Sequence, residues 1–196
     1  MKQMQRISII GTSAAGKSTL ARELSGVLGV PHVELDGLYW EPGWVAAPKE
    51  VFRERVTEAV ATAAWVVDGN YSGARDLVWD RCDTVVWLDY SFATVLGRGV
   101  WRTFRRVVLR EPCCNGNREG WRQALSRDSI VWWIVTTYHR RRREFAERMP
   151  ELEARGVQIV RHRTPRETRG WLDALRREGS QTVVVPAGTA EAGPPL

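Results

Sequence analysis

Five short apolar runs recur along the chain, and stretches with helical spacing separate them. The runs predict β-strands at residues 7–10, 32–35, 65–68, 84–88 and 157–160. The stretches between them predict helices at residues 17–28, 49–63, 92–108, 121–148 and 165–177. Strands that alternate with helices in this way are typical of an α/β protein whose parallel sheet is covered by helices.

Local signals place two helix ends. Thr164 is a good N-cap, Pro165 suits the first turn, and Glu167 completes a capping box. Gly156 is well placed to end the long helix before the last strand. The last helix is therefore predicted to begin at Pro165.

The composition fits one globular domain. The chain has 196 residues, of which 43% are hydrophobic and 27% charged, which is enough to bury a core. We predict one domain over residues 1–178 and a flexible tail over 179–196, where glycine, proline and alanine dominate. The longest internal apolar run, at 130–135, is far shorter than the roughly 18 residues of a spanning helix. Because the N-terminus lacks the pattern of a signal peptide, we expect a cytoplasmic protein with no membrane partner.

Cysteine usage agrees with this location. The three cysteines, Cys82, Cys113 and Cys114, are too few for a disulfide framework or a four-ligand zinc site. The adjacent pair is also too close for ordinary bridging geometry. We expect free thiols in a reducing compartment.

Positive charge is concentrated in one segment. The whole chain has a net charge of +6, and residues 98–127 carry eight arginines against Glu111 and Glu119, which gives the same excess. A local excess of this size indicates an anionic ligand rather than general solubility.

Residues 11–19, GTSAAGKST, satisfy the full P-loop pattern between an apolar strand and an amphipathic helix. The glycines let the backbone N–H groups of residues 13–17 point at the β- and γ-phosphates of a nucleotide. Lys17 adds a mobile positive charge, Ser18 offers its hydroxyl to Mg²⁺, and the helix start presents its positive dipole end to the same anion. The predicted nucleotide-binding residues are Gly11, Ser13, Ala14, Ala15, Gly16, Lys17, Ser18 and Thr19.

Three aspartates follow predicted strands, at the edge of an open α/β sheet where ligands bind. We predict that Asp68, together with Ser18, serves the Mg²⁺ side of the site. Asp36 is predicted to bind an acceptor hydroxyl or to accept its proton. An aspartate at a strand end can also merely cap the next turn, and this alternative is favoured for Asp89.

Beyond the P-loop, the blocks LDGLYW, VVDGNYS and VVWLDYSFATVLGR and the arginine-rich stretch after them resemble adenylate-kinase-like small P-loop kinases. Within these kinases the chain is most similar to the topology modulation proteins, which share the DG-Y-W, DGNYS and GNRE blocks, over about residues 6–176. The resemblance implies a three-layer P-loop NTPase fold. Its five-stranded parallel sheet would have the order 2-3-1-4-5, with an arginine-rich helical lid at about residues 98–127.

The resemblance also implies roles for single residues. It places Asp68 near the metal, Arg98 against the nucleotide base, and the loop Arg163–Pro165 beside the adenine. Adenylate kinases follow their LDG block with phenylalanine, proline and arginine, whereas this chain continues NYSGAR, so Arg75 is the candidate for that arginine's work. The resemblance supports phosphoryl transfer but does not name AMP as the acceptor.

The arginines of the basic segment suit a lid over phosphates. Phosphoryl transfer needs positive charge around the equatorial oxygens, and the planar fork of arginine supplies it with defined geometry. We predict that Arg98, Arg102 and Arg118 contact phosphates. The alternative is a solvated face of a surface helix.

Two other features allow more than one interpretation. The run HRRRRE at 139–144 could bind nucleic acid, but a solvated helix end is favoured. Trp40 and Trp44 could stack on a planar or sugar-like acceptor, although packing is the more common use of tryptophan. Trp132 and Trp133 are predicted to lie in the core.

The leading hypothesis is a Mg²⁺–ATP-dependent kinase that acts on a small molecule, which could be a nucleotide. The predicted catalytic residues are Lys17, Asp36, Arg98, Arg102 and Arg118. The alternative is an ATP-binding regulatory module that acts on nucleic acid or on a protein partner. A GTP-dependent switch is disfavoured, because no NKxD-like guanine-reading stretch follows the fourth strand.

Overall fold

A five-stranded parallel sheet forms the centre of the protein. The computed structural model describes residues 4–109 and 129–181, and within them the strands have the spatial order β2-β5-β1-β6-β7. The strands are Arg6–Gly11 (β1), His32–Glu34 (β2), Trp65–Asp68 (β5), Thr84–Leu88 (β6) and Gln158–His162 (β7). Counted along the chain, this is the order 2-3-1-4-5. The predicted α/β P-loop NTPase fold and its sheet order are therefore confirmed.

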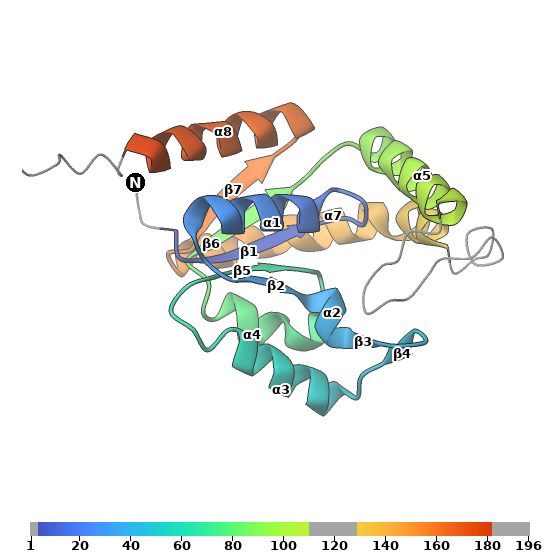
Figure 1. Ribbon diagram of the computed structural model, residues 1–196, viewed down its shortest axis with the longest axis horizontal. Helices are drawn as coiled ribbons and strands as arrows, with labels where there is room; N and C mark the ends of the chain where they lie inside the picture. The colour runs from blue at the N-terminus through green and yellow to red at the C-terminus, as the bar shows by residue number, and fades with distance from the viewer. Residues whose placement is uncertain (1–3, 110–128, 182–196) are drawn as a thin grey trace, which may run out of the picture.

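Helices cover both faces of the sheet and give the domain three layers (Figure 1). On one face lie α1 (Lys17–Leu28) and α8 (Pro165–Gln181), which contact each other. On the other face lie α3 (Lys49–Ala59) and α4 (Arg75–Trp79). This arrangement leaves the carboxyl ends of the strands free to form a site.

The remaining elements surround that edge of the sheet. The long helix α7 (Ile130–Ala154) packs against α5 (Phe92–Val108) and against β7. Several short elements were not predicted from the sequence. They are α2 (Leu35–Tyr39), the hairpin of β3 (Trp40–Glu41) and β4 (Val45–Ala46), the 3₁₀ turn η1 (Ser72–Ala74), and helix α4 (Arg75–Trp79).

Alternate side chains of the strands enter two separate cores. Ile9 and Val66 belong to the core beneath α1, α5 and α8, whereas Ile10 and Val67 belong to the core beneath α3, α4 and the second half of α7. All four side chains are at most 1% exposed. Because the strands are buried on both faces, they read in the sequence as continuous apolar runs rather than as alternating ones.

Both helix-end signals are present in the structure. Gly156 has a φ of 82°, and its N–H donates to the carbonyl of Glu153 at 2.9 Å, so it follows the end of α7 as predicted. At the start of α8, the Thr164 hydroxyl accepts from the Glu167 N–H at 3.2 Å, and the Glu167 carboxylate accepts from the Arg163 N–H at 2.8 Å.

Helix α7 differs from the prediction at its C-terminal end and in its buried face. The helix continues past Pro150 to Ala154, because Leu152 in the last turn packs into the core. Trp132 and Trp133 were expected in the core, but they are 47% and 43% exposed. The helix turns Ile134 and Tyr138 inward instead, and a single helix face cannot bury both sets.

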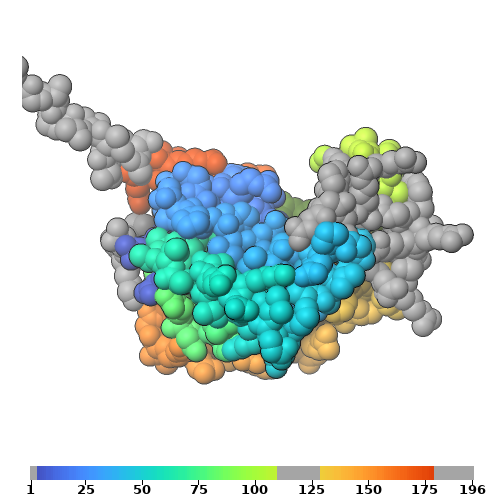
Figure 2. Space-filling model, turned by 60° about the horizontal axis from the view of Figure 1, so that its bottom comes forward, coloured from blue at the N-terminus to red at the C-terminus, as the bar shows by residue number. Residues whose placement is uncertain are grey.

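The segment between β2 and β5 forms one side of the molecule. In the view of Figure 2, residues 35–60, coloured cyan to teal, lie between α1 and α7. Aromatic rings hold this segment together: the ring of Tyr39 lies 4.9 Å from Trp40, 5.2 Å from Phe52 and 4.6 Å from Tyr71. Trp40 meets Trp44 edge to face at 5.7 Å, so both tryptophans pack against other aromatic residues.

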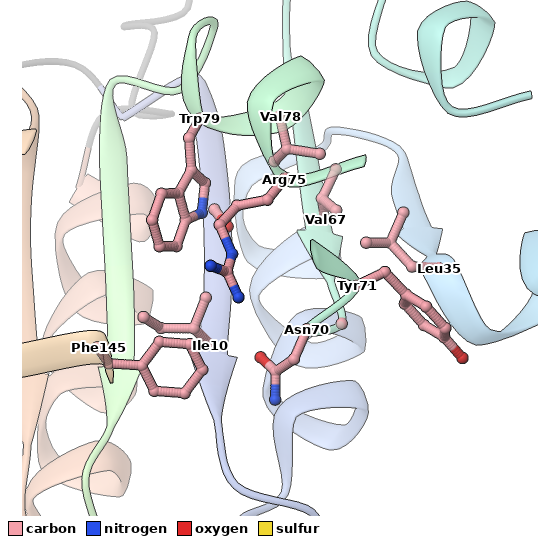
Figure 3. Close-up of a pocket in the computed structure, with 11 residues that line it drawn as sticks. Ile10, Leu35, Val67, Asn70, Tyr71, Arg75, Val78, Trp79 and Phe145 are labelled. Atoms are coloured by element: carbon pink, nitrogen blue, oxygen red, sulfur yellow. The ribbon is translucent and has the colours of Figure 1, made fainter. Parts of the chain in front are cut away.

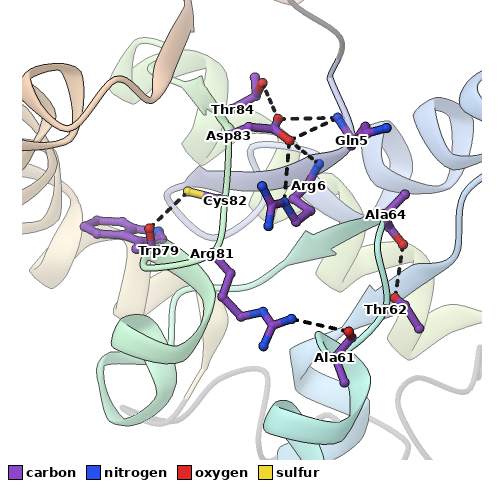
Figure 4. Close-up of polar contacts among 10 residues, drawn as sticks. All are labelled: Gln5, Arg6, Ala61, Thr62, Ala64, Trp79, Arg81, Cys82, Asp83 and Thr84. Carbon is purple, nitrogen blue, oxygen red and sulfur yellow. Dashed lines mark hydrogen bonds and ion pairs between the residues drawn. The ribbon is translucent and has the colours of Figure 1, made fainter.

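At the amino-terminal edge of the sheet, one carboxylate fixes the starts of two strands (Figure 4). Asp83 accepts hydrogen bonds from the N–H of Gln5 at 3.2 Å and from the N–H of Arg6 at 2.8 Å. It also accepts from the hydroxyl of Thr84 at 2.9 Å. These bonds attach the start of β1 to the start of β6, at the sheet edge opposite the P-loop.

We expect Asp83→Ala to lower the free energy of unfolding by about 1–3 kcal/mol, because partly buried backbone donors lose their acceptor. Urea denaturation measures this loss, and the matched control is Asp173→Ala, which removes only an exposed i,i+3 pair with Arg176. Nucleotide affinity should stay at the wild-type value in both variants. A loss of stability that is equal in the two variants would contradict this role for Asp83.

The one cysteine among the described residues is a buried free thiol. Burial raises the pKa of Cys82 to about 12, so the thiolate is scarce at neutral pH. Cys113 and Cys114 lie outside the described residues. Of the predicted tail at 179–196, residues 179–181 belong to the last turn of α8, and the rest lies outside the described residues. No helix in the described ranges is long and apolar enough to cross a membrane.

Candidate phosphoryl-transfer site

The P-loop is a tight turn with left-handed backbone positions directly before a helix. Gly11 has a φ of 150°, and a Cβ added there would lie 2.8 Å from the carbonyl oxygen of Leu88. Ala14 and Gly16 have left-handed φ values of 62° and 98°. Helix α1 begins at Lys17, directly after this turn, with no side chain capping its first N–H groups. Such a concave backbone at a helix N-terminus is a binding site for an anion.

A cavity of about 630 Å³ opens in front of this loop. Its walls bring together three sets of residues that are far apart in the sequence. They are the loop residues 13–19, the carboxylates Glu34, Asp36 and Asp68, and the arginines Arg98, Arg102 and Arg106. Every predicted nucleotide-binding residue except Gly11 lines the cavity; Gly11 lies beneath it as the last residue of β1.

Lys17 lies in the middle of these charges. Its Nζ donates to the carbonyl of Thr12 at 3.2 Å. Burial lowers the pKa of the lysine, while the carboxylates of Asp36 and Asp68 oppose this effect. The mobile cation of the P-loop thus stands between the loop and the two carboxylates that the sequence selected.

Asp68 is a buried carboxylate whose surroundings suit the binding of a cation. It ends β5, is 2% exposed, and its Oδ2 has no hydrogen-bond partner in the described part of the chain. The Nε2 of His32 lies 3.5 Å from its Oδ1. A buried carboxylate oxygen without a partner is costly. Asp68 and the Ser18 hydroxyl therefore fit a divalent cation in this cavity.

Glu34 belongs to the same group of carboxylates, although sequence reasoning missed it. Burial raises the pKa of Glu34, Asp68 and Asp36 raise it further, and a hydrogen bond with the Ser18 side chain acts the other way. Among the described residues, no three His, Cys, Asp or Glu side chains are grouped to hold a metal alone. A cation here would be completed by phosphate oxygens and water, which is the coordination that Mg²⁺ prefers.

Asp36 lines the same cavity as the arginines of α5. It is in the first turn of α2, not at the end of a strand as predicted, because β2 ends at Glu34. Its Oδ1 accepts a hydrogen bond from the hydroxyl of Tyr71 at 2.7 Å. The carboxylate is exposed toward the cavity, so a bound molecule can reach it.

Two of the three predicted lid arginines line the cavity. Arg98 donates from Nη1 to the carbonyl of Ala15 at 2.8 Å, and its guanidinium lies 5.3 Å from the centre of the Tyr90 ring. Arg102 is close enough to Lys17 to lower the pKa of that lysine. The third, Arg118, lies outside the described residues, as does the rest of the predicted lid after residue 109.

Arg141 is a further cation of the site that sequence reasoning did not select. Its Nη1 lies 3.5 Å from the carbonyl of Asn70, its guanidinium lies 5.4 Å from the ring centre of Trp133, and its charge contributes to the lowered pKa of Lys17. Burial lowers the pKa of Arg141, and its Nε is buried without a partner in the described ranges. Part of the HRRRRE run is therefore not a solvated helix end, because α7 turns this one arginine inward.

The arginine next to it has a structural contact instead. Arg142 donates from Nε and Nη2 to the two carboxylate oxygens of Asp89, at 2.6 and 3.1 Å. Arg161 donates from Nη2 to the same carboxylate at 2.5 Å. Asp89 thus joins β6, α7 and β7 through ion pairs. It does not cap the next turn, as the favoured alternative held, because Ser91 is the N-cap of α5. Arg75 was the candidate for the arginine that adenylate kinases have after their LDG block. Its Nη1 donates to the Glu144 carboxylate at 2.6 Å, and its guanidinium lies 5.0 Å from the centre of the Trp79 ring. Its charge is neutralised by that carboxylate.

Comparison with solved structures finds small kinases. A shikimate kinase from Bacteroides thetaiotaomicron has a TM-score of 0.48 and 17% identity, and the match covers 93% of this chain and 100% of that one. A shikimate kinase from Acinetobacter baumannii in complex with shikimate has a TM-score of 0.48 and 16% identity, with 94% and 97% covered. No family model matches the sequence, and no curated protein does. The likeness to topology modulation proteins remains a prediction.

Proposed function

We propose that the protein is a Mg²⁺–ATP-dependent kinase that transfers a phosphoryl group to a hydroxyl of a small molecule. The observation that carries this proposal is the cavity in front of the P-loop. Its lining combines the loop residues and Lys17, which suit a triphosphate, with the carboxylates Glu34, Asp36 and Asp68 and the arginines Arg98, Arg102 and Arg106. Phosphoryl transfer requires this combination of positioning and charge.

The donor side of the proposal rests on the loop and α5. The N–H groups of residues 13–17 and the α1 terminus would hold the β- and γ-phosphates. Arg98 and Tyr90, with Thr168 and Leu172 of α8, line the part of the cavity that would receive the base. Ser18, Asp68 and Glu34 would hold Mg²⁺, which neutralises charge on the phosphates when it is bound.

The acceptor side rests on Asp36. Its carboxylate would accept the proton of the attacking hydroxyl or orient that hydroxyl, and Tyr71 would hold it in place. Lys17, Arg102 and Arg141 would stabilise the negative charge that develops on the transferred group, because all three lie near the same point. Arg118 keeps its predicted role as a phosphate contact.

The proposal predicts ADP release that depends on an acceptor. Purified protein is incubated with Mg²⁺–ATP, with and without pools of nucleosides, nucleoside monophosphates, sugars and small hydroxy acids. We expect one pool to raise ADP release well above the rate with ATP alone, and dividing that pool identifies the acceptor. Omission of Mg²⁺ should abolish the increase.

A rate of ADP release that no pool changes would contradict the kinase proposal. The ATP-binding regulatory module would then account better for the site. Its test is binding of DNA or RNA at several salt concentrations, with and without Mg²⁺–ATP, because phosphate contacts make such binding strongly salt-dependent.

A further inference from the structure

Residues 69–75, which follow β5, contact four parts of the molecule at once. Asn70 donates from Nδ2 to the carbonyl of Gly11, and the Tyr71 hydroxyl donates to Asp36 at 2.7 Å. The carbonyl of Gly73 accepts from Arg53 at 2.7 Å, and Arg75 binds Glu144. Figure 3 shows Asn70, Tyr71 and Arg75 leaving this segment in different directions. The 69–75 segment is thus placed between the P-loop and the acceptor side.

We propose that Asn70 is a positioning residue that sets the orientation of the first peptide of the P-loop. The proposal rests on the proposed function, because it assigns Asn70 an effect on nucleotide binding at the same site. It concerns a contact that neither the P-loop pattern nor the predicted lid contains.

The first argument is the geometry of Gly11. Its backbone is pressed so closely against Leu88 that a Cβ would lie 2.8 Å from the Leu88 carbonyl oxygen. A peptide is planar, so the direction of the Gly11 carbonyl also fixes the direction of the Thr12 N–H. The side-chain amide of Asn70 holds that carbonyl. Asn70 therefore sets the orientation of the Thr12 N–H, at the start of the phosphate-binding loop.

The second argument is the position of Lys17. Lys17 supports the same turn by donating from Nζ to the Thr12 carbonyl at 3.2 Å. A lysine that turns to the β- and γ-phosphates gives up this bond. Asn70 does not line the large cavity, so it can keep its bond to Gly11 when Lys17 moves.

The third argument is that Asn70 is held in place for this contact. Gly69 has a φ of 137°, and a Cβ there would lie 2.7 Å from the Cβ of Leu35, so the chain is fixed immediately before Asn70. The Oδ1 of Asn70 is buried without a partner in the described ranges, beside a cavity of about 10 Å³. A buried amide oxygen left unpaired is costly. The bond from Nδ2 to Gly11 is the side-chain hydrogen bond that the described residues give this amide.

The test is Asn70→Asp, which keeps the shape of the side chain but replaces the donor by a carboxylate oxygen facing a carbonyl. We expect the Kd for Mg²⁺–AMP-PNP, measured by calorimetry, to rise about tenfold or more, because one buried hydrogen bond is lost and a repulsion is added. The matched control is Tyr71→Phe, which removes the hydroxyl on Asp36 and leaves the amide. Its Kd should stay within about twofold of the wild-type value.

A second variant and a second measurement separate positioning from folding. If Asn70→Asp does not fold, Asn70→Ser removes the long amide without adding charge, and the same rise in Kd is expected. In the nucleotide-free protein, amide hydrogen exchange of residues 11–18 should be faster in the Asn70 variants than in Tyr71→Phe. A purely structural role would instead change exchange throughout the domain.

Three results would overturn the inference. Wild-type affinity and wild-type exchange in a folded Asn70 variant would refute the positioning role and leave the kinase proposal intact. An equal loss of affinity in Tyr71→Phe would indicate a general disturbance of the 69–75 segment. Failure of the wild-type protein to bind Mg²⁺–AMP-PNP would remove the proposed function and this inference together.

Discussion

Lys17→Met is expected to lower kcat by roughly 10³-fold or more, because the transition state loses a preorganised positive charge on the transferred phosphoryl group. The variant should remain folded. Burial lowers the pKa of Lys17 because it disfavours the charged form. An apolar side chain of similar length should therefore be tolerated at this position. The measurement is ADP release with the identified acceptor, next to a thermal unfolding curve.

The matched control is Lys49→Met, at the exposed first residue of α3 and away from the cavity lining. It makes the same chemical change and should have wild-type kcat. If Lys17→Met kept its activity, the P-loop would not take part in the chemistry. The assignment of the whole site would then be wrong.

Asp36→Asn is expected to lower kcat by about 10²–10⁴-fold, the range for loss of a positioned general base. The amide keeps an oxygen that can accept the bond from Tyr71, so the local structure should persist. Affinity for Mg²⁺–AMP-PNP should change little, because Asp36 lies on the acceptor side. Measurement of kcat, acceptor KM and nucleotide Kd separates these effects.

The control for this variant is Asp80→Asn, which makes the same change at an exposed ion pair with Arg155. A small decrease in kcat together with a large increase in acceptor KM would mean that Asp36 binds the acceptor without taking its proton. A change confined to nucleotide affinity would place Asp36 on the donor side. Either result would revise the role that we assign to this carboxylate.

The strands and the P-loop were accessible from the sequence because their signals are local. The apolar runs of β5 and β6 match the predicted strands at both ends, since strands buried on both faces leave continuous apolar stretches. Helices α1 and α5 also match at both ends. The P-loop is contiguous, so its pattern contains almost all of the phosphate-binding backbone.

The short elements between β2 and β5 could not be predicted in the same way. Helix α2 has five residues and each strand of the β3–β4 hairpin has two, which is too short for a periodic pattern. Their arrangement comes from packing among Tyr39, Phe52 and Tyr71, and Tyr71 lies in a different part of the chain.

The sequence by itself determined that this protein has a P-loop α/β fold, and it selected Lys17, Ser18, Asp36 and Asp68. These residues belong to the P-loop or follow short apolar runs, where local pattern fixes position. Only the tertiary structure decided which residues of the long helices reach the site. On α7 it turns Arg141 toward Asn70, leaves Trp132 exposed and uses Arg142 to bind Asp89. The physical reason is that neighbouring positions on a helix point in different directions, and the packing of the whole helix selects which of them turns inward.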